Sequence, residues 1–263
     1  MRDSLPATRD NVSQLAASLV ERLRLRSPRV HCITNAVAQN FTANVLLAAG
    51  AVPSMTLSVE EIGPFVAGAN SLLVNLGTFD RERREATEIA VETAAHQNVP
   101  WVLDPVFMDR SAARADFART LFARTPKAVR LNAAEFTVLS GNEPACDALA
   151  AYARSTKSVI ALSGATDLVG DGERLAAIAN GHPLMAKVTA MGCAVSALVA
   201  ACLGVEQDTW LATVAALAIA GVAGELAAKK AAGPGSFAVA FVDTMFNLDG
   251  PMLVANARVN PQR

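Results

Sequence analysis

Short apolar runs alternate with amphipathic segments along most of the chain. Apolar residues between Val12 and Leu23 recur at spacings of three and four, which predicts an amphipathic helix. Further helices are predicted at 41–50, where Gly50 ends the pattern, and at 81–97 and 116–124. Between these helices, continuous apolar runs predict strands at 29–33, 51–55, 71–77, 101–105, 128–132 and 158–164.

The rest of the chain is predicted to form a hairpin followed by helices. The turn Gly170-Asp171-Gly172 predicts an antiparallel hairpin, and the chain from Met191 onward has a helical pattern. Strands that are apolar throughout and alternate with helices indicate a mainly parallel sheet covered by helices on both faces. Because no linker or repeat interrupts the alternation, we expect an α/β fold with a single domain over residues 1–263.

Composition and charge limit the possible partners. Hydrophobic residues make up 52% of the 263 residues and charged residues 18%, which excludes an intrinsically disordered chain. The 23 Lys and Arg residues against 24 Asp and Glu residues give a net charge of -1. Such a chain has no global basic field, so we expect neither nucleic acid nor an anionic membrane as a partner.

Cysteine usage and the apolar stretches predict a cytoplasmic protein. The four cysteines form no CxxC pair, and the first residues contain no apolar signal region. The most apolar stretch, 191–224, is interrupted by Glu206 and Asp208. The two pieces have about 15 uncharged residues each, where a membrane span needs about 20, so buried helices are expected.

The first candidate for chemistry is the start of the alanine-rich helix at Ala190–Cys193. Unpaired amides and the positive end of the helix dipole favour a phosphoryl group there, and they can lower the pKa of Cys193 below ~8.5 so that it acts as a base. The alternative is an ordinary helix start, in which Thr189 is the cap and Cys193 is a small buried residue.

A second candidate is a pair of carboxylates. Asp104 ends one predicted strand and Glu135 follows the next one at Asn132, so both lie where ligands bind in parallel sheets. Mg²⁺ is typically held by one or two carboxylates together with substrate phosphates, so this pair suffices. Alternatively, Asn132 and Glu135 form a capping box at a helix start, and Asp104 before a proline is a turn residue.

Seven segments spread over nearly the whole chain resemble the hydroxyethylthiazole kinase family. They are HCITNAVAQNFTANVLLAAGAVPSM, LLVNLGTF, PWVLDPV, VRLNAAEF, ALSGATD, GHPLMAKVTAMGC and GPGSFAVAF, in this order. The resemblance implies a ribokinase-like fold and the phosphorylation of 4-methyl-5-(2-hydroxyethyl)thiazole with ATP and Mg²⁺ in thiamine salvage and biosynthesis. It also implies a homotrimer with active sites between subunits.

The resemblance assigns roles to individual residues. It implies that Cys193 is catalytic, at the place where related sugar kinases carry an aspartate. The implied binding residues are Asn35, Met55 and Ala190 for the thiazole, Arg130 and Ser163 for ATP, Asp104 and Glu135 for Mg²⁺, and Ala190, Met191, Gly192 and Cys193 for the anion hole.

The chain departs from the family pattern at three places. Ala190-Met191 replaces a sequence that starts with glycine, so the loop is strained if its backbone needs a positive φ at Ala190. Ser163 replaces threonine and keeps the hydroxyl, while Leu131 replaces a glycine and threatens to crowd the nucleotide.

Two other functions stay open: a kinase for another small alcohol, and an inactive relative that binds thiazole or nucleotide. We expect His31 and His182 to be structural.

Overall fold

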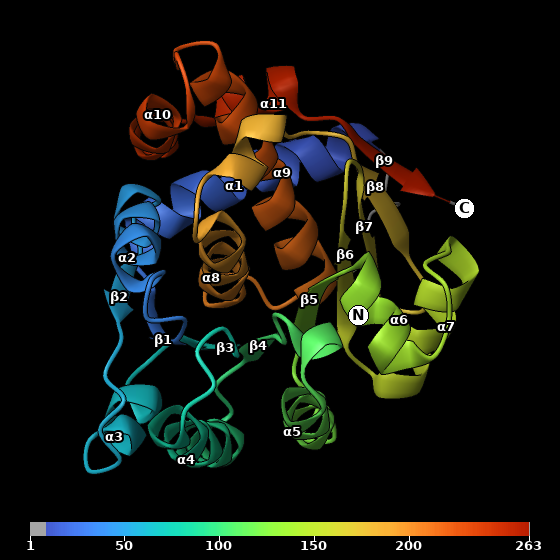
Figure 1. Ribbon diagram of the computed structural model, residues 1–263. Coiled ribbons are helices and arrows are strands. Elements are labelled where there is room, and N and C mark those ends of the chain that lie inside the picture. Colours follow the sequence, from blue (N-terminus) through green and yellow to red (C-terminus); the bar gives the residue numbers. More distant parts are fainter. Residues whose placement is uncertain (1–8, 263) are drawn as a thin grey trace.

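The computed structural model describes residues 9–262, which contain one nine-stranded sheet (Figure 1). The strand order is β2-β1-β3-β4-β5-β6-β7-β8-β9. Strands β1 to β6 run parallel, and β6 to β9 pair in an antiparallel manner. Their bounds are β1 Arg29–Ile33, β2 Val52–Ser54, β3 Ser71–Asn75, β4 Trp101–Asp104, β5 Ala128–Asn132, β6 Val159–Ser163, β7 Asp167–Gly170, β8 Leu175–Ile178 and β9 Val259–Gln262.

Helices cover both faces of the sheet (Figure 1). The larger core lies under α1 Arg9–Arg26, α2 Gln39–Ala48, α8 Met191–Leu203, α9 Thr209–Ala228, α10 Pro234–Asn247 and α11 Gly250–Asn256. The opposite core lies under α3 Ile62–Ala67, α4 Arg81–Gln97, α5 Ala112–Phe122, α6 Ala133–Ser140 and α7 Cys146–Thr156. Two short 3₁₀ helices are η1 Met108–Arg110 and η2 Pro183–Lys187. The predicted α/β fold, with a mainly parallel sheet between helices, is confirmed.

The strand register brings polar residues together at the carboxyl ends of the strands. Asn75 at the end of β3 lies opposite Asp104 at the end of β4. In the same way, Asn132 of β5 lies opposite Ser163 of β6. Side chains from four strands are therefore available at one edge of the sheet, which is where parallel sheets bind ligands.

Several predicted boundaries are confirmed, and others are wrong for identifiable reasons. Strand β1 and helix α4 have the predicted bounds, and Gly50 follows α2 with φ +93°, as a helix-ending glycine does. Helix α5 begins earlier than predicted, because the Ser111 side chain caps it at Arg114 N. The prediction of helices alone after Met191 missed β9, which pairs with the hairpin strand β8.

Helix α9 is longer than the interrupted apolar stretch suggested. It has 20 residues and is long and apolar enough to cross a membrane. The prediction that both apolar pieces of this stretch are too short to span a membrane is therefore wrong for α9. The structure buries 83% of its apolar window among the helices and strands that surround it. The expectation of a buried helix is thus confirmed, and core packing accounts for its composition.

Candidate active site

A cleft of about 1060 Å³ opens at the carboxyl ends of β4, β5 and β6. Its other walls are the loop from Asn180 to Ala190 and the start of α8. The structure brings together nearly all the residues predicted to act: Asn35, Asp104, Arg130, Glu135, Ser163, Ala190, Met191, Gly192 and Cys193. Met55 is the exception, since it follows the edge strand β2 and packs against the larger core instead.

Asp104 is held in place by two side chains. The Asn75 Nδ2 group donates a hydrogen bond of 2.7 Å to Asp104 Oδ2, and Ser196 Oγ donates one of 2.8 Å to the same oxygen. Burial raises the pKa of this carboxyl, and the positive charge of Arg130 acts in the opposite direction. Because both side chains donate to Oδ2, they fix the orientation of the carboxylate.

Glu135 is both a helix cap and a residue of the cleft. Its Oε2 accepts from Asn132 N at 2.9 Å, while Asn132 Oδ1 accepts from Glu135 N at 3.0 Å, which completes the predicted capping box. Its Oε1 accepts from Phe107 N at 2.9 Å. Burial raises the pKa of Glu135, and the nearby charge of Asp104 raises it further. The capping role and a role in the cleft therefore coexist in one side chain.

These two carboxylates fit a divalent cation. Two buried, mutually repelling carboxylates at one cleft are stabilised by a positive ion between them. Within residues 9–262 no cluster of three or more His, Cys, Asp or Glu side chains offers a closed cage. An open pair of this kind suits a cation that keeps waters and substrate phosphates among its ligands.

The start of α8 offers backbone amides to the cleft. Ala190 precedes the helix with φ +74° and ψ -4°, and no side chain caps the helix, so the alternative with Thr189 as cap is wrong. The Met191 amide donates to Val188 O at 3.3 Å, whereas the amides of Ala190, Gly192 and Cys193 have no acceptor among the described residues. Met191 itself is buried in the larger core and also lines the cleft.

Burial changes the expected chemistry of Cys193. Burial, followed by the negative charge of Asp104, raises the pKa of its thiol to about 12. The expectation of a lowered pKa is therefore wrong, because desolvation outweighs the helix dipole. At neutral pH the group is a protonated thiol, and Asn75 Nδ2 donates to its sulfur at 3.3 Å. One amide group thus links Cys193 to Asp104.

Arg130 in β5 and Ser163 at the end of β6 both line the cleft, Arg130 opposite Ala161 and Ser163 opposite Asn132 in the strand register. Arg130 donates from its guanidinium to Gly192 O at 3.3 Å, which ties β5 to the start of α8. Ser163 Oγ donates to Leu131 O at 3.1 Å. The Leu131 side chain is buried in the smaller core and the residue also lines the cleft, so crowding of the nucleotide by Leu131 stays a prediction.

Asn35 and Met55 occupy different places on the β1 side of the sheet. Asn35 Oδ1 accepts from Val37 N and from Thr78 Oγ1, which holds the side chain at the rim of the cleft. The loop of Met55 is fixed by His31, whose Nδ1 accepts from Ser54 Oγ at 2.8 Å while Nε2 donates to Thr56 O at 3.2 Å. Burial lowers the pKa of His31 to about 4, so this histidine is structural, as expected.

Three residues of the site escaped prediction. Asn75 and Ser196 orient Asp104, and Asp167 lines the cleft beside Ser163 with a pKa raised by burial. Asn75 lies two residues before Gly77, the glycine that closes its apolar run, so the position of the strand end was a usable signal. Ser196 lies inside an apolar helix and Asp167 inside a hairpin, where nothing in the sequence sets them apart.

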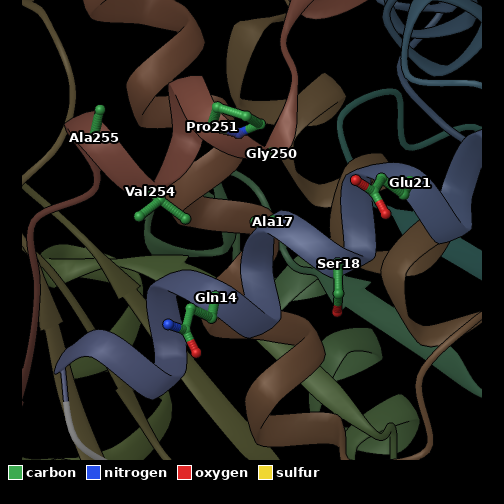
Figure 2. Close-up of a pocket in the computed structure, with 8 residues that line it drawn as sticks. All are labelled: Gln14, Ala17, Ser18, Glu21, Gly250, Pro251, Val254 and Ala255. Carbon is green, nitrogen blue, oxygen red and sulfur yellow. The ribbon is translucent and has the colours of Figure 1, made fainter.

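A second hollow of about 610 Å³ lies between α1 and α11 (Figure 2). Glu21 is the one ionisable side chain among its lining residues, which are otherwise small, apolar or uncharged: Gln14, Ala17, Ser18, Gly250, Pro251, Val254 and Ala255. It shares no residue with the cleft. A hollow with a single charge and no converging polar groups does not have the composition of a catalytic site.

The sequence and the fold of the chain can be compared with those of known proteins. A sequence profile described as "Hydroxyethylthiazole kinase family" matches residues 20–250. The chain belongs to the hydroxyethylthiazole kinase family. A protein of Agrobacterium fabrum named "Probable hydroxyethylthiazole kinase" is 43% identical over 249 residues, which cover 94% of this chain and 96% of that protein.

Solved structures agree with this family assignment. The structure of the hydroxyethylthiazole kinase protein of Pyrococcus horikoshii OT3 superimposes with a TM-score of 0.92 at 34% identity, covering 95% of this chain and all of that one. A ribokinase-like superfamily protein of Enterococcus faecalis has a TM-score of 0.70 at 14% identity and covers 93% of this chain and 96% of its own. The second likeness shows the fold alone, and it confirms the predicted ribokinase-like architecture.

Proposed function

We propose that this protein transfers the γ-phosphoryl group of ATP to the hydroxyl group of 4-methyl-5-(2-hydroxyethyl)thiazole, in thiamine salvage and biosynthesis. Its family is named for that activity, and the relatives at 43% identity carry the same name. The observation that carries the proposal is the cleft itself, where three carboxyl side chains, one arginine and three free amides meet. Positioning and charge neutralisation of this kind supply most of the rate in phosphoryl transfer.

The proposed cation is Mg²⁺. As a kinase family implies, the reaction uses ATP and a divalent metal, and Asp104 and Glu135 are the carboxylates we assign to it. When bound, Mg²⁺ neutralises phosphate charge and orients the phosphates. We assign Arg130 and Ser163 to ATP, because both line the cleft from the neighbouring strands β5 and β6.

The start of α8 is proposed to hold the transferring group. The amides of Ala190, Gly192 and Cys193 form the anion hole, and the Met191 amide joins them only by giving up its bond to Val188 O. Cys193 stays protonated at neutral pH, so we assign it a contact with the acceptor hydroxyl as a neutral thiol. The proposed thiazole-binding residues are Asn35, Ala190 and Met55.

Assembly is part of the proposal, because Met55 lies outside the cleft of its own chain. We propose a cytoplasmic homotrimer in which residues 1–263 form one kinase domain and Met55 serves a neighbouring copy. Support comes from large apolar side chains exposed on α2 and α10, where Leu47 is 57% exposed, Val239 64% and Phe246 67%. Apolar surface of this kind marks sites of association. All four cysteines are free, as in a reducing compartment.

A coupled assay of ADP formation tests the proposal. With Mg²⁺ and ATP, we expect hydroxyethylthiazole to accelerate ADP formation and pyridoxal to leave it at background. If only another alcohol accelerated ADP formation, the result would favour the alternative of a kinase for another small alcohol. Nucleotide binding without turnover would favour the inactive binding protein.

A further inference from the structure

The loop 179–182, between β8 and η2, forms a wall of the cleft to which the proposed function assigns no role. Asn180, Gly181 and His182 line the cleft on the side of β6, across from Asn35 on the side of β1. In the sheet order β8 lies two strands beyond β6, whose last residue is Ser163. Along the sheet, the wall is therefore closer to Ser163, which is proposed to bind ATP, than to Asn35, which is proposed to bind the thiazole.

Asn180 joins this loop to the carboxy-terminal elements. Its side chain is only 6% exposed, so its polar atoms need partners within the protein. Its Oδ1 accepts from Arg258 N at 2.6 Å, and its Nδ2 donates to Asn256 O at 2.9 Å and to Glu225 Oε1 at 3.2 Å. One buried amide thus connects the loop with α9, α11 and the segment before β9.

Glu225 on α9 completes the connection. Its Oε1 accepts from Gly181 N at 2.8 Å, and both of its oxygens accept from the Arg258 guanidinium. Although burial raises the pKa of Glu225, the hydrogen bonds from Arg258 and Gly181 outweigh it and hold that pKa below its usual range. The carboxylate is therefore charged at neutral pH and binds a backbone amide of the cleft wall.

Two glycines bring the wall directly onto the helix. A Cβ atom added at Gly221 would lie 2.6 Å from Asn180 Cβ, and one added at Gly224 would lie 2.5 Å from Met185 Sδ. Both distances are shorter than real contacts of this kind. The loop therefore rests on the backbone of α9, and its position depends on that surface.

We propose that Asn180 and Glu225 are positioning residues that fix this wall and thereby set the affinity of the cleft for ATP. The proposal rests on the proposed function, since it places the nucleotide beside Ser163. The position of loop 179–182 depends on α9 and Arg258, because the contacts that hold the loop come from them. Loss of the Glu225 carboxylate is expected to release the Gly181 amide and weaken nucleotide binding more than thiazole binding.

The test compares Glu225→Gln with the matched control Glu206→Gln. Glu206 also pairs with an arginine, Arg22, also accepts from a backbone amide, and has 17% side-chain exposure against 18% for Glu225, but it does not line the cleft. Calorimetry measures binding of the ATP analogue AMP-PNP with Mg²⁺, steady-state kinetics give both KM values, and hydrogen exchange reports on Gly181. Gly221→Ala provides a second variant, because the added methyl group would displace Asn180 without changing the Glu225 carboxylate.

We expect Glu225→Gln and Gly221→Ala to raise the Kd of AMP-PNP and the KM for ATP about 10-fold, because a shift of about 1 Å in a positioning group can cost up to about 100-fold. The KM for thiazole should stay within about twofold, and the Gly181 amide should exchange faster. Equal rises in both KM values, or faster exchange with unchanged AMP-PNP binding, would overturn the proposal. Failure of the parent to phosphorylate thiazole would instead refute the proposed function, since the ratio of AMP-PNP affinities is measured without turnover.

Discussion

The Ala190→Gly substitution should stabilise the protein, although glycine usually destabilises a folded chain. Ala190 has φ +74°, one of six non-glycine residues with a positive φ among the described residues. A left-handed conformation costs an L-residue roughly 1–2 kcal/mol, and glycine does not pay this cost. Glycine also has more entropy than alanine in the unfolded chain, and this offsets about 0.4–1 kcal/mol of the free energy gained by relieving the strain. The expected net gain in the free energy of unfolding is about 0.5–1 kcal/mol.

Urea unfolding measures this gain, and Ala123→Gly is the control. Ala123 is an exposed alanine at the end of α5 with φ -62°, where an L-residue is unstrained. The same chemical change there should lower the free energy of unfolding by about 0.4–1 kcal/mol, because glycine has more entropy in the unfolded chain. For a chain of this size, 1 kcal/mol corresponds to a change in Tm of about 2–4 °C, so the two variants should move in opposite directions. If Ala190→Gly destabilises as much as Ala123→Gly, position 190 carries no strain.

Three further predictions concern the charges of the site and of the core. Glu135→Gln should lower kcat by roughly 100-fold or more, because it removes one of the two carboxylates while a glutamine still caps α6; a parent-like kcat in steady-state assays would return Glu135 to a purely structural role. Iodoacetamide at pH 7.5 should modify exposed Cys146 and spare Cys193, whose thiol has a pKa of about 12; equal labelling of both in mass spectra would show that the Cys193 thiol is activated. Because the pKa of His31 is lowered from 6.5 to about 4, the unfolded chain binds its proton first, and stability falls as the pH drops below 6.5. Between pH 7 and pH 5 the parent should lose about 2 kcal/mol more than His31→Gln in urea unfolding, and equal losses would contradict the buried, neutral histidine.

The sequence predicts the parallel part of this fold well because local and global signals agree there. Strand β1 contains the apolar residues Val30, Cys32 and Ile33. Helix α4 has a cap at Asp80 and an αL residue at Asn98, so both of its ends are marked in the sequence. Strand β9 has no such signal, since its residues Val259–Gln262 include a proline and become a strand only by pairing with β8. Tertiary pairing decides such a segment.

The candidate site shows the same division. Asp104 and Glu135 were predictable because strand ends in a parallel sheet lie at one edge. The pKa of Cys193 was not, because the helix position favours a thiolate while the burial that opposes it depends on packing by distant residues. The strain at Ala190 was predictable in kind from its replacement of glycine, and the structure supplies its φ of +74°.

Identification of the reaction product tests the central claim most directly. The protein is incubated with ATP, Mg²⁺ and 4-methyl-5-(2-hydroxyethyl)thiazole, and the mixture is analysed by ³¹P NMR and mass spectrometry. We expect a phosphate monoester on the hydroxyethyl group, formed in equal amount to ADP and abolished when a chelator removes the metal. ADP formed with inorganic phosphate and no thiazole ester, or no turnover at all, would contradict the account.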